Sequence, residues 1–412
     1  MNTAIIFVLV LGILIFVHEL GHFMTARKLG IGVEEFGFGY PPRVFGVLVS
    51  KKKKNQKASN EAEAKDVNDT VKKSSSHWKF FWGNKIKSED LNRTTEDPII
   101  YSLNLLPLGG FVKILGENGE QSNNPENFAN QAAWKRSLVL SAGVIMNFIF
   151  AFVLLSIGFL LGLPQTIDQN TPQDMVSDQK VVIVEISPKS PAEEQGLKVN
   201  DVIVAIDGVN VKNTNEVFDK LKVNTEVTFT IDRNKEQQEV KLSPRTMPDY
   251  DKPIIGVAMV DTGIIKYGFF GSIWQGLKVT AILSVRVLEA LYALLYNLVT
   301  QGKVSADLSG PIGVAVITGQ VAEMGFIYLL QFAAILSINL GIINILPFPA
   351  LDGGRLLFIV IEKIRRKKVS EKVEGIAHNV GFMLLMALVV VITYRDVQKY
   401  GVGFLDKIKN LF

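Results

Sequence analysis

Four stretches of the 412-residue chain are apolar over enough residues to cross a lipid bilayer as helices. They cover residues 3–26, 138–163, 326–346 and 380–393, and the last is short enough to need flanking residues. Polar segments rich in Gly and Pro separate them and interrupt the helical periodicity. The pattern predicts a polytopic α-helical membrane protein with four transmembrane helices.

Basic residues between these stretches set the predicted orientation, because Lys and Arg accumulate in cytoplasmic loops. Arg27, Lys28 and residues 51–54 follow the first stretch, and Lys135 and Arg136 precede the second. More basic residues connect the third stretch to the fourth. We therefore expect these loops to be cytoplasmic, both termini to be outside, and the region between the second and third stretches to be extracytoplasmic.

Two segments on the predicted cytoplasmic side, residues 37–42 and 101–113, mix apolar residues with Gly and Pro too densely for a helix. They predict a membrane-associated β-hairpin region, with Gly109 and Gly110 in its second segment. An exposed strand edge in this region could hold a bound polypeptide extended. A plain cytoplasmic hairpin is equally compatible with the sequence.

Residues 51–97 form a polar insertion between these two segments. Its first half is rich in Lys, Ser and Asn, which predicts disorder. Its second half contains Trp78, Phe80, Phe81 and Trp82 with Lys residues nearby, so we expect this part to rest on lipid headgroups.

The predicted extracytoplasmic region contains a domain with a different pattern of apolar and polar residues. Short apolar runs separated by turn signals such as Asp207-Gly208 predict strands between residues 181 and 244. Residues 190–197 (S-P-A-E-E-Q-G-L) followed by 199–208 (V-N-D-V-I-V-A-I-D-G) resemble a bacterial PDZ domain. The resemblance implies one PDZ-like α+β domain over residues 175–246. Such a domain binds peptide C-termini by strand addition, or it excludes bulky substrates, and we favour the size filter.

A long semi-apolar helical pattern follows over residues 265–300. Because Lys278, Arg286 and Glu289 interrupt it, we expect a helix on the membrane surface rather than a fifth span. Residues 308–313 (L-S-G-P-I-G) are expected to form a loop that leads to the third span.

The composition of the chain excludes several classes of protein and of chemical site. Hydrophobic residues make up 48% of the chain and charged residues 20%, which suits a membrane protein with polar appendages. There is no Cys, which excludes disulfides, thiolate ligands and a cysteine nucleophile. The net charge of +4 lies in loops beside apolar segments, which argues against nucleic-acid binding. The N-terminus lacks a basic leading region, so we expect the first span to be retained.

The first apolar stretch contains His18-Glu19-Leu20-Gly21-His22. Residues four apart share one face of a helix, so His18 and His22 can present two imidazoles to one metal ion. Glu19 lies beside them, where a carboxylate could take a proton from a metal-bound water. Ionisable residues at membrane depth are costly and typical of functional sites. The alternative is a chance match, with both histidines hydrogen-bonded between packed helices.

A third ligand is suggested by residues 344–354, N-I-L-P-F-P-A-L-D-G-G, at the end of the third stretch. At about 1.5 Å of rise per residue, His18 lies roughly 20 Å below the outer surface. The third stretch runs in the same direction and brings Asp352 to a similar depth. The alternative is a solvated loop residue at a helix end. With no Cys in the chain, His and Asp ligands suit zinc with an open coordination position.

The two motifs together resemble the site-2 protease family of intramembrane zinc metalloproteases, and within it the bacterial regulator-of-sigma-E protease type. The resemblance covers nearly the whole chain. It implies that Zn²⁺ is bound by His18, His22 and Asp352, that Glu19 is the general base, and that Asn344 orients substrate or stabilises the oxyanion. Gly143 and Asn147, in S-A-G-V-I-M-N-F, match the family's G-x-x-x-N element. Candidate substrate-binding residues are Asn147, Gly143, Gly109 and Gly110, with ordinary helix packing as the alternative for the pair on the second span.

The resemblance implies a zinc endopeptidase in the bacterial cytoplasmic membrane, with its active site near the cytoplasmic side. Its substrates would be single-span membrane proteins already cut outside, such as anti-sigma factors or remnant signal peptides. A non-catalytic membrane PDZ adaptor with a structural metal site is the main alternative, and an intact Glu19 argues against it. A metal-ion transporter is a further alternative, but the sequence shows one metal motif and no charged pathway.

These predictions divide the chain into eight parts. The first four are the first transmembrane helix with the start of the β region (residues 1–50), the insertion (51–97), the second part of the β region (98–133) and the second transmembrane helix (134–164). The last four are the PDZ-like domain (175–246), the surface helix (265–300), the third transmembrane helix with Asp352 (326–354) and the fourth transmembrane helix (376–397).

Overall fold

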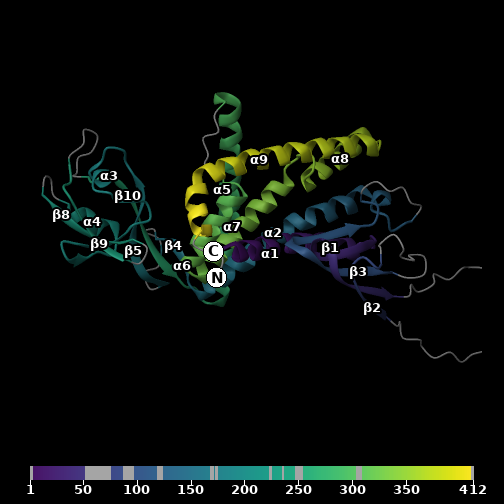
Figure 1. Ribbon diagram of the computed structural model, residues 1–412, viewed down its shortest axis with the longest axis horizontal. Helices are drawn as coiled ribbons and strands as arrows, with labels where there is room; N and C mark the ends of the chain where they lie inside the picture. The colour runs from purple at the N-terminus through teal and green to yellow at the C-terminus, as the bar shows by residue number, and fades with distance from the viewer. Residues whose placement is uncertain are drawn as a thin grey trace, which may run out of the picture. The chain divides into compact units, whose positions relative to one another are not determined.

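The computed structural model describes residues 3–51, 76–86, 97–117, 124–167, 171, 175–221, 225–233, 236–245, 254–302 and 309–409. The predicted disordered part of the insertion, residues 52–75, lies outside the described residues. The chain divides into two compact units, one of residues 1–154 with 277–412 and one of residues 155–276. Figure 1 shows the elements of both units.

Within the described part of the chain, five helices are long and apolar enough to cross a membrane. Four of them correspond to the predicted spans: α1 (Thr3–Lys28), α2 (Ala133–Leu161), α7 (Phe326–Ile345) and the stretch Lys372–Lys399 of α9 (Glu371–Lys409). The fifth is α5 (Phe269–Gln301), for which the sequence predicted a position on the membrane surface. Its length and composition also allow it to span, so that surface position stays a prediction.

Two shorter helices differ from the sequence prediction. Helix α6 (Pro311–Met324) begins inside the segment expected to be a loop, of which Ser309 and Gly310 remain irregular and Leu308 lies outside the described residues. Proline suits the first helical position, because its missing N–H has no partner there in any helix. The run of apolar residues after Pro311 then continues the helix.

Helix α8 (Asp352–Arg365) also changes the predicted boundary. The third apolar stretch was predicted over residues 326–346, within a wider segment of residues 326–354, and α7 ends at Ile345. Pro347 and Pro349 cannot continue a helix, and Asp352 is instead the first residue of α8. An acidic residue in a first turn is favourable beside the positive end of the helix dipole.

The predicted β region is one sheet in the order β2-β1-β3, formed by β1 (Val33–Lys51), β2 (Ser76–Trp82) and β3 (Ile99–Ile114). Strands β1 and β3 are long and irregular, so Phe36 of β1 pairs with both Val112 and Tyr101 of β3. Strand β2 lies within the predicted insertion and pairs with the second half of β1, where Phe45 is opposite Trp82. Ordered backbone therefore extends into the insertion from both sides.

Helices α2, α6 and α7 pack closely around the first half of α1. Ile6, Val10 and Leu14 of α1 are buried against Phe150 of α2 and apolar residues of α7. Glycine allows a tighter approach further along, because a Cβ on Gly21 would lie 2.8 Å from the carbonyl carbon of Ala142. Small residues at such crossings are typical of membrane helix pairs.

A second apolar cluster lies where α1 leads into β1. It joins the end of α1, the first turns of α2, α8 and the 3-10 helix η2 (Phe128–Asn130). Its fully buried members include Ala26, Ile31, Val33 and Val139. The cluster holds the sheet and α8 next to the end of α1.

The unit of residues 155–276 contains a sheet in the order β4-β10-β5-β6-β8-β9, with β7 paired to β6. Its elements are β4 (Leu163–Thr166), β5 (Val176–Ile186), α3 (Pro191–Glu194), β6 (Val202–Ile206), β7 (Val209–Asn210), α4 (Thr214–Lys220), β8 (Val227–Arg233), β9 (Glu236–Leu242) and β10 (Val257–Ile265). The core contains Val181, Ile183, Ile203, Phe229 and Ile231.

This sheet extends beyond the predicted domain of residues 175–246 at both ends. Strand β10 lies between β4 and β5, so it is an inner strand of the sheet. Its segment V-A-M-V-D-T-G-I-I contains polar residues and Gly, which weakened its apolar run in the sequence.

A buried carboxylate connects α9 to α6. Asp396 is 3% exposed and accepts hydrogen bonds from the backbone N–H groups of Gly310, at 3.2 Å, and Gly313, at 2.7 Å. Gly310 is the N-cap residue of α6 and has no side chain with which to cap it. Asp396 therefore satisfies the first amides of a helix that is distant in sequence.

Replacing Asp396 with Ala should loosen the start of α6, because two amides lose a charged acceptor. A hydrogen bond to a charged group contributes about 1.5–3 kcal/mol, so hydrogen exchange at Gly313 should accelerate roughly tenfold or more. Exchange measured by mass spectrometry on the full chain tests this, with Asp396→Asn as an intermediate variant. Unchanged exchange in Asp396→Ala would contradict this account of the cap.

Candidate active site

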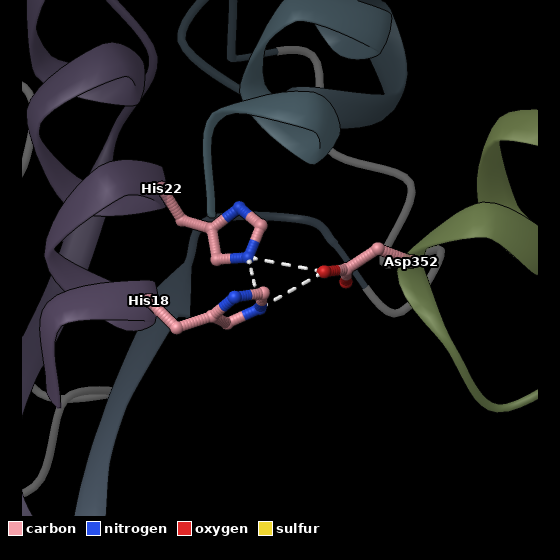
Figure 2. A group of neighbouring side chains, drawn as sticks. All are labelled: His18, His22 and Asp352. Atoms are coloured by element: carbon pink, nitrogen blue, oxygen red, sulfur yellow. Dashed lines mark hydrogen bonds and ion pairs between the residues drawn. The ribbon is translucent and has the colours of Figure 1, made fainter. Parts of the chain in front are cut away.

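His18, His22 and Asp352 meet at one point although Asp352 is 330 or more residues away in sequence. His18 Nε2 lies 3.0 Å and His22 Nε2 3.3 Å from Asp352 Oδ2, and the two Nε2 atoms are 3.2 Å apart. Figure 2 shows both rings directed from α1 toward the carboxylate at the start of α8. The sequence prediction that these three residues meet agrees with this geometry.

The spacing of these atoms fits a metal ion. Zinc–nitrogen bonds of about 2.0–2.1 Å in a tetrahedral site separate neighbouring ligand atoms by about 3.3 Å. The three atom pairs here are 3.0–3.3 Å apart. Two imidazoles and one carboxylate also form a donor set typical of a catalytic zinc site that keeps one position open.

His22 is held in the tautomer that such a site needs. Its Nδ1–H donates to the carbonyl oxygen of Val139, in the first turns of α2, at 2.8 Å. A carbonyl oxygen can only accept, so the proton is on Nδ1 and the lone pair of Nε2 faces His18 and Asp352. Such a contact is the usual way in which proteins orient a metal-binding histidine.

His18 has a corresponding contact with Asn147 of α2. The Asn147 amide nitrogen lies 3.1 Å from His18 Nδ1, while its Oδ1 is buried without a hydrogen-bond partner among the described residues. Turning the amide by 180° exchanges these two atoms in the same space. Oδ1 then accepts a proton from His18 Nδ1, which leaves Nε2 free to bind a metal. A metal at Nε2 leaves the proton on Nδ1, so this orientation of the amide fits a metal-bound His18.

Asp352 is positioned by the short loop between α7 and α8. Ala350 in this loop has a φ of 80°, in the left-handed region, and its N–H donates to His378 Nδ1 of α9 at 2.8 Å. Gly381, one turn further along α9, allows close packing, since a Cβ there would lie 2.7 Å from the carbonyl carbon of Pro349. Helix α9 therefore fixes the backbone that leads into Asp352.

His378 was not identified as a site residue from the sequence. Two signals were available: the chain has only four histidines, and this one lies in an apolar helix. Its partner is a backbone amide in a proline-containing loop, and no sequence spacing indicates such a contact.

Glu19 lies beside the histidines and touches the sheet. The N–H of Val112 in β3 donates to Glu19 Oε2 at 3.2 Å. Two glycines just before it bring the strand close to α1: a Cβ on Gly109 would lie 2.6 Å from Ile15, and one on Gly110 would lie 3.2 Å from Phe16. Gly109 also has a φ of 110°, which favours glycine. Both glycines contact α1 rather than the histidines.

The remaining predicted residues do surround the histidines. Asn344 Nδ2, in the last turn of α7, lies 3.4 Å from His18 Nε2. Gly143 of α2 leaves room for the rings, because a Cβ there would be 2.8 Å from His18 Nε2. Asn147 contributes the contact with His18 described above. Helices α1, α2 and α7 and the start of α8 thus all supply part of the cluster.

The sequence model of peptidase family M50 matches residues 6–56 and 78–388 of this chain. The gap of residues 57–77 lies within the predicted insertion. The PDZ domain of an SdrC-like protein from Listeria innocua is similar to a part of the chain, at 24% identity, covering 19% of this chain and 92% of that one with a TM-score of 0.18. The PDZ-like assignment continues to rest on the sequence motif.

Two relatives match over almost their full length. The zinc metalloprotease RasP of Geobacillus kaustophilus is 31% identical over 484 residues, covering 97% of this chain and 99% of the relative. The regulator of sigma-W protease RasP of Bacillus subtilis is 30% identical, again covering 97% of this chain and 99% of the relative. The chain therefore belongs to peptidase family M50, the site-2 proteases, and is a zinc metalloprotease.

Proposed function

We propose that this metalloprotease cleaves the transmembrane segments of single-span membrane proteins after a first extracytoplasmic cut. The observation that carries the proposal is the meeting of His18, His22 and Asp352 among helices long enough and apolar enough to span a membrane. Substrates would be anti-sigma factors or remnant signal peptides. The name of the Bacillus subtilis relative, a regulator of sigma-W protease, supports the first of these classes.

His18, His22 and Asp352 would hold the zinc ion through two Nε2 atoms and one carboxylate oxygen. Bound zinc supplies Lewis acidity and an activated water at neutral pH. The contacts of His22 with Val139 and of His18 with Asn147 keep both imidazoles in the metal-binding tautomer. The protein would thus have the geometry of its site in place before substrate arrives.

Glu19 would act as the general base. Glu19 directly follows His18 in α1, and the Val112 N–H restrains its carboxylate. The carboxylate takes the proton of the attacking water and passes it to the leaving amine. Asn344 would donate from its amide to the developing oxyanion, since its Nδ2 already faces His18 Nε2 at 3.4 Å.

The edge of β3 would hold the substrate. In the described part of the chain, β3 pairs only with β1. A substrate segment added along β3 near Val112 would be extended, which exposes carbonyls that a helix hides in its own hydrogen bonds. The same segment would lie next to Glu19, because Val112 contacts that carboxylate. Gly109, Gly110, Gly143 and Asn147 would then shape the space around it.

The orientation is part of the same proposal. The basic residues Arg27 and Lys28 at the end of α1 favour a cytoplasmic position for that end, and hence for the nearby site. The membrane would be the bacterial cytoplasmic membrane. The PDZ-like domain would lie on its extracytoplasmic side, where it would act as a size filter or bind peptide C-termini. The matches to full-length metalloproteases leave the non-catalytic adaptor and the metal-ion transporter without support.

Glu19→Gln should abolish proteolysis while leaving the metal site intact. General base catalysis contributes roughly 100-fold to 10,000-fold, so cleavage of a single-span reporter in proteoliposomes should fall by about that factor. Zinc content, measured by mass spectrometry on the purified protein, should equal that of the wild type. Equal cleavage by variant and wild type would refute the assigned role of Glu19.

Asn147→Ala should weaken zinc binding, because His18 loses the partner that fixes its tautomer and ring orientation. Loss of such a partner typically lowers metal affinity about 10-fold to 100-fold, which competition with a chelator would measure. Ser337→Ala is a matched control, since Ser337 is also fully buried and donates only to the Asn147 backbone carbonyl. If both variants bind zinc like the wild type, Asn147 has only a packing role.

His378→Leu should lower both zinc affinity and cleavage, because the Ala350 N–H loses its acceptor and the loop before Asp352 is released. We expect a fall of roughly 10-fold, from a lost buried hydrogen bond of about 1–2 kcal/mol. His378→Gln keeps an acceptor and should recover part of both quantities. A loss of thermal stability with normal zinc affinity in His378→Leu would show that the contact serves folding alone.

A further inference from the structure

Strand β2 takes no part in the proposed chemistry. It is the outer strand of the sheet, on the far side of β1 from β3. The match to the peptidase family stops at residue 56 and resumes at residue 78, so β2 begins in the unmatched segment and its residues 78–82 lie in the matched range. The strand nevertheless has an ordered seven-residue pairing with β1.

The two sides of β2 differ sharply. Trp78, Phe80 and Trp82 alternate along the strand and are 63%, 64% and 66% exposed. Phe81 points to the other side and is only 6% exposed, because it covers Gly46 and lies 5.3 Å beneath the guanidinium of Arg43. The exposed aromatics are therefore set in place by a buried neighbour and are not a frayed end.

The exposed side of β2 continues across the sheet. Phe45 of β1 lies 6.0 Å from Phe80 and 5.3 Å from Trp82, measured between ring centroids. In the register of the sheet, Val47 and Val49 of β1 are opposite Phe80 and Trp78. On β3, Tyr101 and Leu103 follow in the same rows. We name this surface the aromatic face: Phe45, Val47, Val49, Trp78, Phe80, Trp82, Tyr101 and Leu103.

The inner margin of the aromatic face meets the end of α1. The Tyr101 ring lies 6.0 Å from that of Phe23, near the end of a helix whose last turn carries Arg27 and Lys28. A spanning helix with aromatic and basic residues at its end leaves the bilayer there. Phe23 is only about 6 Å along the axis from Arg27. The aromatic face therefore begins at the level of the lipid headgroups.

We propose that the aromatic face docks on the lipid bilayer at the interface where α1 ends. Trp78, Phe80 and Trp82 would enter the headgroup region, where amphipathic aromatic rings are favoured over both water and the acyl core. The exposed Lys79 lies between them on the opposite side of the strand, where it stays in water.

Docking at β2 would also fix the height of the whole sheet against the membrane. The opposite strand, β3, contacts Glu19 through Val112. An anchored sheet would present this edge at a constant depth and so align a substrate with the cluster. This consequence rests on the proposed function, whereas the docking itself does not.

The absence of Cys from the chain allows a direct test. Phe80→Cys and its matched control Lys79→Cys, each labelled with a nitroxide, would be placed in vesicles of phosphatidylcholine and phosphatidylglycerol. Position 80 should collide more often with oxygen and less often with a water-soluble nickel complex, and position 79 should show the reverse. Equal access of nickel to both positions overturns the proposal. Shielding of position 80 from both reagents also overturns it, since that result indicates a protein partner.

A second measurement leaves the aromatic face unchanged. The chain has four tryptophans, so the variant Trp134→Phe/Trp274→Phe keeps only Trp78 and Trp82. Their fluorescence should be quenched more strongly by lipids brominated close to the headgroup than by lipids brominated near the chain end. Absence of quenching by either lipid contradicts docking.

The consequence for catalysis has its own test. Trp78→Ser/Phe80→Ser/Trp82→Ser should cleave a single-span reporter in these vesicles several-fold more slowly than the wild type, with normal zinc content. Lys79→Ser should cleave at the wild-type rate. Equal rates for the triple variant and the wild type overturn the role of docking in catalysis. If the wild type does not cleave at all, the proposed function fails, while the nitroxide and quenching results still decide the docking.

Discussion

Three ionisable side chains among apolar helices can persist only if they satisfy one another or share a cation, because an unpaired polar group in such surroundings costs several kcal/mol. Much of the larger unit follows from this constraint. His18 and His22 must share one face of α1, and Asp352 must reach them from another part of the chain. The outer nitrogens of both rings need partners as well, which Val139 and Asn147 of α2 supply. Glycine at residues 21 and 143 removes the bulk that would keep α1 and α2 apart.

Irregular backbone next to this cluster needs cover of its own, since unpaired peptide groups are tolerated at membrane depth only where protein or water surrounds them. The loop before Asp352 obtains it from α9, through the His378 contact with Ala350 and the close packing at Gly381. The N–H groups at the start of α6 are also covered by α9, because Asp396 accepts their hydrogen bonds. Helix α9 is mostly exposed over residues 372–399, yet it supplies an acceptor, His378 or Asp396, on either side of its apolar run of residues 380–393.

The sequence predicted those parts of the fold that rest on local periodicity or on a shared depth. The apolar runs located α1, α2, α7 and α9, and depth arguments placed Asp352 beside His18 and His22. Helices α6 and α8 escaped prediction because each begins at a residue, Pro311 or Asp352, that was interpreted as part of a loop or of a longer helix. The contact of His378 with a backbone amide joins segments with no common spacing. The boundary of β10 was missed because its place inside the sheet depends on pairing with distant strands.

The sheet β2-β1-β3 connects the contact with Glu19 to the aromatic face. The β1–β3 pairing holds Val112 near Glu19, and the separate β1–β2 pairing places Phe45 of β1 opposite Trp82 of β2. A slip of β2 by one residue along β1 would turn the aromatic side chains toward the Arg43 side, and a slip of β3 along β1 would move a different amide to Glu19. Strand β1 is the common partner in both pairings. The restraint on Glu19 and the exposure of the aromatic face therefore both depend on β1, each through a different one of its two neighbours.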